Sequence, residues 1–193
     1  MAECNILVEG ISDQILLANA SAALQKLGRP HLDLADVAII PYSEEPVLRQ
    51  LVAMARSYRA RVVVLADTDQ QGRRITQYCQ REGIPHFTIL PFAERTDGSA
   101  SIEDLVGVEE YTTAVNDFYG EFDWFTQLDP AEVETERHDL SLGAFLEKQF
   151  CARFQRSFSK TALAVHIAER APDLSGHVLQ RFEALFSAIL TAP

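Results

Sequence analysis

The chain has 193 residues, enough for one domain with a sizeable hydrophobic core, or for one domain plus a helical extension. Its hydrophobic fraction of 47% is that of an ordinary globular protein, and no apolar run approaches the roughly 20 residues of a membrane span. The N-terminus has no charged leader and no cleavage signature, so we expect a cytoplasmic protein without a membrane anchor. The three cysteines are far apart, which argues against a disulfide framework and against a cysteine metal site.

The net charge of −11 is concentrated in one segment. Residues 94–139 contain 14 acidic and 2 basic residues, a net charge of −12, whereas the rest of the chain contains 14 acidic and 15 basic residues, a net charge of +1. The overall acidity therefore does not exclude nucleic-acid binding elsewhere on the chain. It does require that phosphate contacts come from a local basic cluster or from a metal ion.

The first half of the chain alternates predicted strands and helices. Apolar runs predict strands at residues 4–8, 37–40, 61–66 and 86–90. Helical spacing predicts helices at residues 12–27, 44–58 and 72–81. Ser12 is the expected N-cap of the first helix, and Gly28 is its natural stop. Continuous apolar strands that alternate with helices are typical of a parallel sheet covered on both faces.

The pattern changes after Pro91, beyond which the chain is mainly helical. Residues 102–119 have a helical pattern, and residues 120–140 are acidic and aromatic without a clear period. Three further helices are predicted at residues 141–155, 159–171 and 175–190.

We therefore expect two parts in an α/β protein. Residues 1–106 form a catalytic core around a parallel sheet of about four strands flanked by helices. Residues 107–193 form a mainly helical extension that packs on this core and includes both the acidic segment and the helix of Lys160.

Acidic residues stand at the ends of the first and third predicted strands. Glu9 follows the first strand, and Asp67 and Asp69 follow the third. Carboxyl ends of parallel strands meet at one edge, and side chains two residues apart on an extended chain point the same way, so these carboxylates are expected to share a site. Asp13 lies in the first turn of the next helix and can turn back toward that edge. Alone, each acid has an ordinary alternative, a helix-terminal charge or a turn; their order at consecutive strand ends indicates a site.

A set of ligands made of oxygen atoms alone suits Mg²⁺, Mn²⁺ or Ca²⁺ and does not suit zinc. Four carboxylates exceed what one Mg²⁺ usually takes from a protein, whereas two ions about 4 Å apart would use them well. Such a pair of ions holds the attacking and leaving oxygens of a phosphodiester. Gly10 and Gly72 would let the backbone approach this site closely. The sequence leaves open whether one ion binds or two.

The two motifs Glu9-Gly10 and Asp67-Thr68-Asp69, with Gly72 three residues on, resemble the TOPRIM domain of topoisomerases, primases and several nuclease families. The resemblance implies a Rossmann-like parallel sheet with a divalent-metal site. Topoisomerases usually follow the aspartates with a negatively charged residue, whereas Gln70-Gln71 follows here, and neither strand-passage domains nor the polymerase elements of primases are found. A small TOPRIM ribonuclease that matures ribosomal RNA is an open alternative.

Two later motifs resemble the OLD (overcoming lysogenization defect) family of TOPRIM nucleases. In Ser101-Ile102-Glu103-Asp104-Leu105, Glu103 matches an acidic residue that completes the metal site of that family. In Phe158-Ser159-Lys160-Thr161, Lys160 matches a lysine that lies near the metals at the start of a helix. Because the chain has three lysines, a lysine at this position of the motif is less expected by chance than in a lysine-rich protein. The resemblance covers residues 6 to about 171.

The resemblance implies a metal-dependent endonuclease that cleaves or nicks DNA, in anti-phage defence or DNA repair. The catalytic residues would be Glu9, Asp67, Asp69 and Lys160. The ligands of Mg²⁺ or Mn²⁺ would be Glu9, Asp13, Asp67, Asp69 and Glu103.

The chain departs from the OLD pattern in two ways. Pro41-Tyr42-Ser43 stands where that family often has a glycine-lysine turn, and the chain lacks the phosphate-binding Gly-Lys-Ser/Thr loop of the ABC-type ATPase that usually precedes the nuclease. We therefore expect an isolated nuclease domain or a free-standing relative, with any ATPase on another segment or a partner chain. The competing class is a TOPRIM module that binds or regulates through the acidic aromatic segment, with catalysis either absent or dependent on a partner chain.

Contacts with DNA, or with RNA as the alternative substrate, are expected from two arginine pairs. Arg73 and Arg74 lie beside the predicted metal loop. Arg153 and Arg156 would share a face with Lys160 if one helix were continuous, although the serines between them weaken this prediction. The ordinary alternative for all four arginines is a solvated helix surface.

Overall fold

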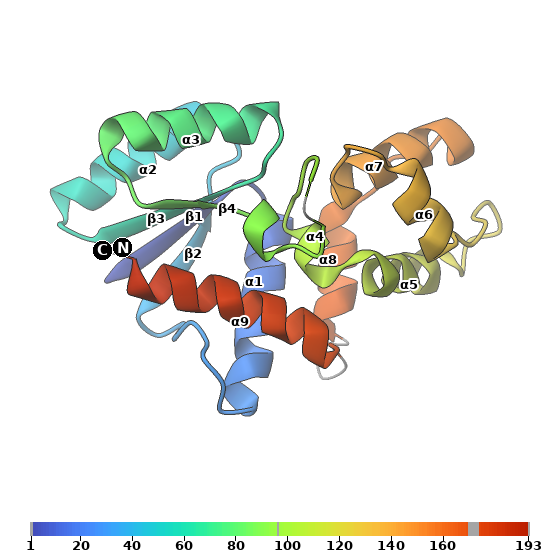
Figure 1. Ribbon diagram of the computed structural model, residues 1–193, viewed down its shortest axis with the longest axis horizontal. Coiled ribbons are helices and arrows are strands. Elements are labelled where there is room, and N and C mark those ends of the chain that lie inside the picture. The colour runs from blue at the N-terminus through green and yellow to red at the C-terminus, as the bar shows by residue number, and fades with distance from the viewer. Residues whose placement is uncertain (1, 96, 170–173, 193) are drawn as a thin grey trace.

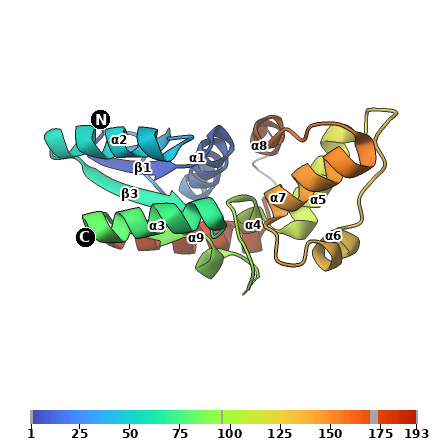
Figure 2. The same cartoon turned by 90° about the horizontal axis from the view of Figure 1, so that it is seen from above.

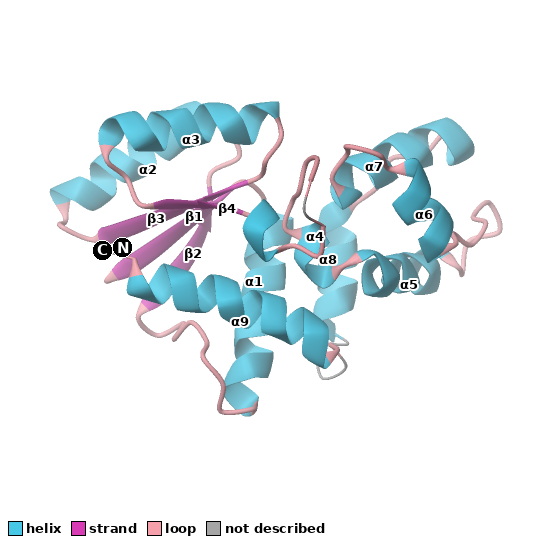
Figure 3. Cartoon of the chain, in the orientation of Figure 1, coloured by secondary structure: helices cyan, strands magenta, loops and turns pink. Residues whose placement is uncertain are grey.

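The structure, a computed structural model, describes residues 2–95, 97–169 and 174–192. These residues form a four-stranded parallel sheet with the strand order β2-β1-β3-β4. The strands are β1 (Cys4–Val8), β2 (Val37–Pro41), β3 (Arg61–Ala66) and β4 (His86–Thr88). The predicted α/β class is confirmed, and Figure 3 shows the sheet at one end of the molecule with helices around it.

Helices cover both faces of the sheet (Figure 1). Two of them, α2 (Glu45–Ser57) and α3 (Gln70–Glu82), lie on one face, and α1 (Ile11–Lys26) and α9 (Gly176–Thr191) lie on the other. In β1, the side chain of Leu7 packs in the core under α2 and α3, whereas its neighbours Ile6 and Val8 pack in the opposite core. Alternate residues of one strand thus enter two cores, which is why the strand is apolar throughout.

The other helices form a second group beside the sheet (Figure 2). In chain order they are η1 (Leu90–Phe92), α4 (Glu103–Val106), α5 (Val108–Tyr119), α6 (Pro130–Glu136), α7 (Leu142–Gln149), η2 (Phe150–Phe154) and α8 (Lys160–Glu169). The centre of this group is aromatic: the ring of Tyr119 lies 4.6 Å from that of Phe150 and 6.1 Å from that of Phe158. Trp124 and Phe125, whose rings each lie 5.8 Å from that of Tyr119, pack against this centre, so residues 120–140 contribute to the packing of the extension.

The last helix returns to the sheet. The guanidinium of Arg61, at the start of β3, donates to the carbonyls of Ile189 and Ala192, both at 2.6 Å. Arg29 forms an ion pair with Glu183 of α9. One hydrophobic core runs from this face of the sheet into the helical extension. The boundary between a core and an extension at residues 106 and 107 stays a prediction. The helix α9 belongs to the predicted extension but is bonded to Arg29 and Arg61 of the predicted core.

Several element ends differ from the prediction for reasons that side chains supply. The N-cap of α1 is Gly10 and not Ser12, because the carboxylate of Asp13 accepts from the Gly10 N–H at 2.9 Å. The helix predicted for residues 102–119 is broken at Gly107, which has a φ of +90°, a backbone conformation that glycine adopts readily and other residues rarely do. At this break Arg181 donates to the carbonyls of Leu105 and Val106, which no longer accept helical bonds.

The predicted helix over residues 141–155 is regular in α7, becomes a π-helical turn in η2, and ends before Gln155 at φ +53°. The short helix α6 lies within residues 120–140, where no period was apparent. Part of the predicted helix over residues 159–171 lies outside the described residues. No helix in the described ranges is long and apolar enough to cross a membrane.

Candidate metal-binding site at the sheet edge

The candidate site begins where two central strands end. The strands β1 and β3 pair directly, with Cys4 opposite Arg61 and Leu7 opposite Val64. Asp67 follows β3 immediately, and Glu9 follows β1 immediately, so the two acids leave the sheet at the same edge. This is the edge at which open parallel sheets bind their ligands.

Two further aspartates stand in the helix starts that follow these strands. The side chain of Asp13 closes the first turn of α1 through its bond to Gly10. Asp69 is the N-cap of α3, and its Oδ1 accepts from the Gly72 N–H at 2.7 Å. A Cβ at Gly72 would lie 1.8 Å from the backbone oxygen of Asp67, so only glycine allows the turn between these aspartates.

The carboxylates of the site influence one another. Burial raises the pKa of Glu9, and the nearby charges of Asp69 and Glu103 raise it further. Burial and the charges of Glu103 and Glu9 raise the pKa of Asp13 to about 7. The pKa of Asp67 is raised well above its usual range by burial and then by the charges of Asp13, Glu103 and Glu9. These groups from three segments therefore form one electrostatic unit.

The buried carboxylate of Glu103, in the first turn of α4, lies beside a cation. Glu103 is 1% exposed, and its Oε1 lies 3.9 Å from the Nζ of Lys160. The same Nζ lies 3.5 Å from the Oε1 of Glu147. Burial lowers the pKa of Lys160, but the charges of Glu103 and Glu147 raise it by more, so this ammonium keeps its proton. The structure thus brings Lys160 next to Glu103, and their charges act on Glu9, Asp13 and Asp67.

The position of Lys160 follows from its two predecessors in the chain. Phe158 is buried in the aromatic core, where its ring lies 4.8 Å from that of Phe150. The Ser159 N–H donates to the Tyr119 hydroxyl at 3.1 Å, and the Ser159 hydroxyl accepts from the N–H of Ala162 at 3.2 Å, as a helix cap does. Lys160 therefore begins α8 from an anchored point.

The donors of the site fit a divalent ion by their chemistry. All five acids offer oxygen, and one buried carboxylate oxygen each of Glu9 and Glu103 has no hydrogen-bond partner among the described residues. An unpaired buried carboxylate oxygen is costly unless a proton or a cation meets it. In the side-chain positions of this structure, however, no group of three or more His, Cys, Asp or Glu within the described ranges is gathered so that it could hold a metal ion.

The comparison with known protein families bears on this edge. Residues 1–69 match the family model described as "Overcoming lysogenization defect protein-like, TOPRIM domain". Residues 1–69 are thus similar to an OLD-like TOPRIM domain. The predicted resemblance is confirmed, and the matched residues run from β1 to Asp69, so they include four of the five acids of the site.

The fold is also that of solved OLD structures. The C-terminal region of the Burkholderia pseudomallei OLD protein superposes with a TM-score of 0.58 at 14% identity, covering 99% of this chain and 100% of that one. The C-terminal region of the Xanthomonas campestris pv. campestris OLD protein gives TM-scores of 0.51 at 10% identity (100% and 99% covered) in a structure phased with iodine, and 0.53 at 12% identity (97% of each) in one phased with mercury. A search of curated proteins gave no significant match.

The arginines predicted to contact DNA lie in two places. Arg73 and Arg74 are exposed in the first turns of α3, beyond the Asp69 cap. Arg153 lies in η2 with its guanidinium 5.8 Å from the Phe154 ring, and Arg156 lies 5.8 Å from the Trp124 ring. Because η2 ends before Lys160 begins α8, one continuous helix does not carry Arg153, Arg156 and Lys160. Their contact with nucleic acid stays a prediction.

The sequence did not predict that Asp104, the neighbour of Glu103, forms a buried hydrogen-bond network beside the site. The carboxylate of Asp104 is 2% exposed and accepts from Arg137, from the Ser101 N–H at 2.9 Å and from the Leu142 N–H at 3.1 Å. Burial raises the pKa of Asp104, although Arg137 and the two N–H groups oppose this shift. Asp104 thus joins the turn of Glu103 to the start of α7, which its place in an acidic helix start did not reveal.

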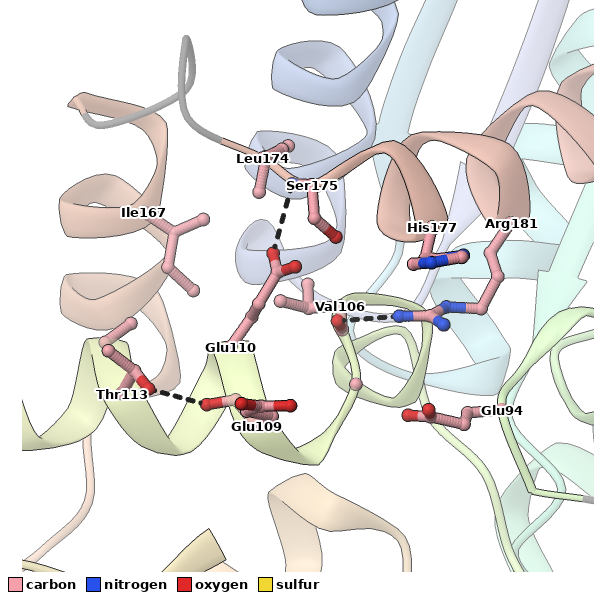
Figure 4. A pocket seen from close by; sticks show the side chains of 12 residues that line it. Glu94, Val106, Glu109, Glu110, Thr113, Ile167, Leu174, Ser175, His177 and Arg181 are labelled. Atoms are coloured by element: carbon pink, nitrogen blue, oxygen red, sulfur yellow. Dashed lines mark hydrogen bonds between the residues drawn. The ribbon is translucent and has the colours of Figure 1, made fainter.

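A separate cavity of about 870 Å³ opens between α5, α8 and α9 (Figure 4). None of its lining residues belongs to the predicted site. Its walls are tied by the bond from the Ser175 N–H to Glu110 and by the bond from Arg181 to the carbonyl of Val106. The cavity therefore lies apart from the sheet edge that carries the candidate site.

Proposed function

We propose that this protein is a divalent-metal-dependent nuclease that cleaves phosphodiester bonds of DNA at the edge formed by β1 and β3. The observation that carries the proposal is the clustering of charge: burial and the charges of Glu103 and Glu9 raise the pKa values of Asp13 and Asp67, and buried Glu103 lies beside Lys160. Carboxylates placed together cost stability in the absence of a cation, and perturbed acids of this kind concentrate at functional sites.

In this proposal the five acids, Glu9, Asp13, Asp67, Asp69 and Glu103, hold Mg²⁺ or Mn²⁺. A divalent ion bound there supplies activated water and offsets the charge of the phosphate. The ammonium of Lys160 is fixed beside Glu103 and keeps its proton, so it stabilises negative charge that develops on the phosphate. The exposed guanidiniums of Arg73 and Arg74 bind neighbouring phosphates of the DNA backbone.

The family match supports this choice among the functions that acidic sites perform. The OLD-like TOPRIM family is generally associated with nucleases, and the match spans both strand ends that carry the site. DNA is the proposed substrate, and RNA is tested beside it. Any ATPase that controls the cleavage would lie on a partner chain or on another segment.

The decisive experiment is incubation of the purified chain with supercoiled plasmid in Mg²⁺, in Mn²⁺ and in EDTA, with a structured RNA of similar length in parallel. We expect nicked and linear DNA with Mg²⁺ or Mn²⁺ and none with EDTA. The variant Asp67→Asn should lose this activity, whereas Asp123→Asn, an exposed acid of the extension, should keep it. Absence of cleavage with either ion at enzyme excess would contradict the proposal, and cleavage of RNA alone would replace DNA as the substrate.

A further inference from the structure

The start of α7 lies against the pair formed by Lys160 and Glu103. Ser141 is the N-cap of this helix, and Gly143 is its second residue. A Cβ at Gly143 would lie 2.8 Å from the Cε of Lys160, 2.9 Å from its Nζ and 3.0 Å from the Oε2 of Glu103. Real Cβ atoms do not approach other heavy atoms as closely as the first two distances. The end of the lysine side chain therefore occupies the space that any side chain at position 143 would need.

Backbone conformation does not explain this glycine. Gly143 is not among the described glycines with positive φ, and it lies in the regular first turn of α7. Alanine is the better helix former at such a position. A close backbone approach does not explain it either, because the three nearest atoms all belong to the side chains of Lys160 and Glu103.

The position of Gly143 relative to Glu103 is fixed by the buried carboxylate of Asp104. This group accepts from the N–H of Leu142, the residue before Gly143, and it follows Glu103 directly in the chain. The glycine and the glutamate are thus held by one anchor, whereas Lys160 reaches them with a long side chain from α8. Of the three groups, the lysine end is the one that can move.

We propose that Gly143 is a positioning residue, whose missing side chain leaves the room in which the Lys160 ammonium lies against Glu103. The inference rests on the proposed function in one respect, since it connects this room to cleavage through Lys160. A methyl group at position 143 displaces the ammonium, and displacement of a reacting or stabilising group by about 1 Å can cost roughly a hundredfold in rate.

The test is Gly143→Ala with Gly176→Ala as its matched control. Gly176 is the first residue of α9, and a Cβ there would meet nothing within 4 Å. Both variants should melt at the wild-type temperature or above it, because each places alanine in a helix. With ¹³Cε-labelled lysine the chain gives three signals, from Lys26, Lys148 and Lys160. In Gly143→Ala the Lys160 signal should move and the other two should not; in Gly176→Ala none should move.

Cleavage connects the displacement to function. We expect Gly143→Ala to cleave plasmid about tenfold to a hundredfold more slowly than wild type, and Gly176→Ala to match wild type. The double variant Gly143→Ala with Lys160→Ala should be no slower than Lys160→Ala alone, because the glycine acts through the lysine.

Three results would overturn the inference: an unmoved Lys160 signal in Gly143→Ala, a large fall in its melting temperature, or a double variant much slower than Lys160→Ala. The lysine signal is read without any cleavage. If it moves while the wild type cleaves neither DNA nor RNA, the proposed function fails and the positioning of Lys160 by Gly143 stands.

Discussion

Glu103 and Asp104 are neighbours in the chain and almost equally buried, yet their carboxylates belong to different networks. Asp104 accepts from Arg137, Ser101 and Leu142, so its oxygens are fully engaged within the protein. In Glu103, Oε1 has no hydrogen-bond partner among the described residues and faces the ammonium of Lys160 at 3.9 Å. One acid supports the turn, and the other remains available to a ligand.

This difference predicts opposite effects on stability. Asp104→Asn should destabilise the fold by about 3 kcal/mol or more, because it leaves the guanidinium of Arg137, 3% exposed, without its buried anion. Glu103→Gln should change stability little, since it removes one of several crowded charges. Urea unfolding at pH 7 without metal measures both. Equal losses in the two variants would mean that both acids are structural.

The raised carboxylate pKa values predict how the metal-free protein responds to pH. In the fold the pKa of Asp13 is about 7 instead of 3.8, so between these values the folded state binds more protons than the unfolded chain. This contribution to stability is fully present below about pH 3.8 and is lost as the pH rises through about 7. The pKa of Asp67 is shifted in the same direction.

The variant Asp67→Asn isolates one part of this effect, because asparagine does not titrate. At pH 8 without metal it should be more stable than wild type by about 1 to 3 kcal/mol, which raises the melting temperature by roughly 2–4 °C for each kcal/mol. The difference should shrink toward pH 5. Thermal melts at pH 5, 6.5 and 8 measure it, with Asp123→Asn as the control for a general loss of negative charge. A constant difference across this range would show that Asp67 is not a strained acid.

Asp69 has a second role that separates two substitutions. Its carboxylate caps α3 through the bond from Gly72. Asp69→Ala should therefore cost about 1 kcal/mol of stability, whereas Asp69→Asn should keep most of the cap. Both variants lose a charged oxygen ligand, and both should abolish metal-dependent nicking. Melting temperatures and plasmid cleavage measured side by side separate the roles; full activity in Asp69→Asn would remove Asp69 from the ligand set.

The strands were predictable from the sequence because their apolar runs are bounded on both sides. The prediction matched β1 and β3 residue for residue, since each run ends in an acid or a glycine. Helix ends were less predictable where a side chain from elsewhere competes. Ser12 is a good N-cap by residue type, but the capping bond of Asp13 moves the start of α1 to Ile11. At the break between α4 and α5, the carbonyl of Val106 accepts from Arg181, which lies 74 residues beyond Gly107 in the chain.

The contacts of the candidate site also differ in how far the sequence predicts them. The nearness of Glu9 to Asp67 followed from the rule that parallel strands share an edge. No periodic pattern in the sequence predicts that Lys160 lies near Glu103, because the two residues are 57 positions apart. The resemblance to OLD nucleases suggested this contact. No sequence pattern predicts the role of Gly143, since this role depends on a contact among three segments that lie far apart in the chain. A glycine inside a well-capped helix start was the available signal.

Lys160 gives the sharpest prediction about chemistry, because the chain offers a natural control. Lys160→Ala should reduce the cleavage rate by about a hundredfold or more, as the loss of comparable electrostatic donors does. Lys148, in the last turn of α7, is the matched lysine outside the site, and Lys148→Ala should cleave at the wild-type rate.

Metal binding separates a role in catalysis from a role in holding the site together. A cation that acts on charge developing in the transition state is not needed to bind metal, and its charge opposes a neighbouring ion. Calorimetry with Mn²⁺ should therefore give an affinity for Lys160→Ala equal to that of wild type or slightly higher. Lys160→Arg keeps the charge but not the compact ammonium that fits beside Gly143, so it should restore only part of the rate. If Lys160→Ala cleaves as fast as wild type, or binds Mn²⁺ much more weakly, Lys160 does not act on the phosphate.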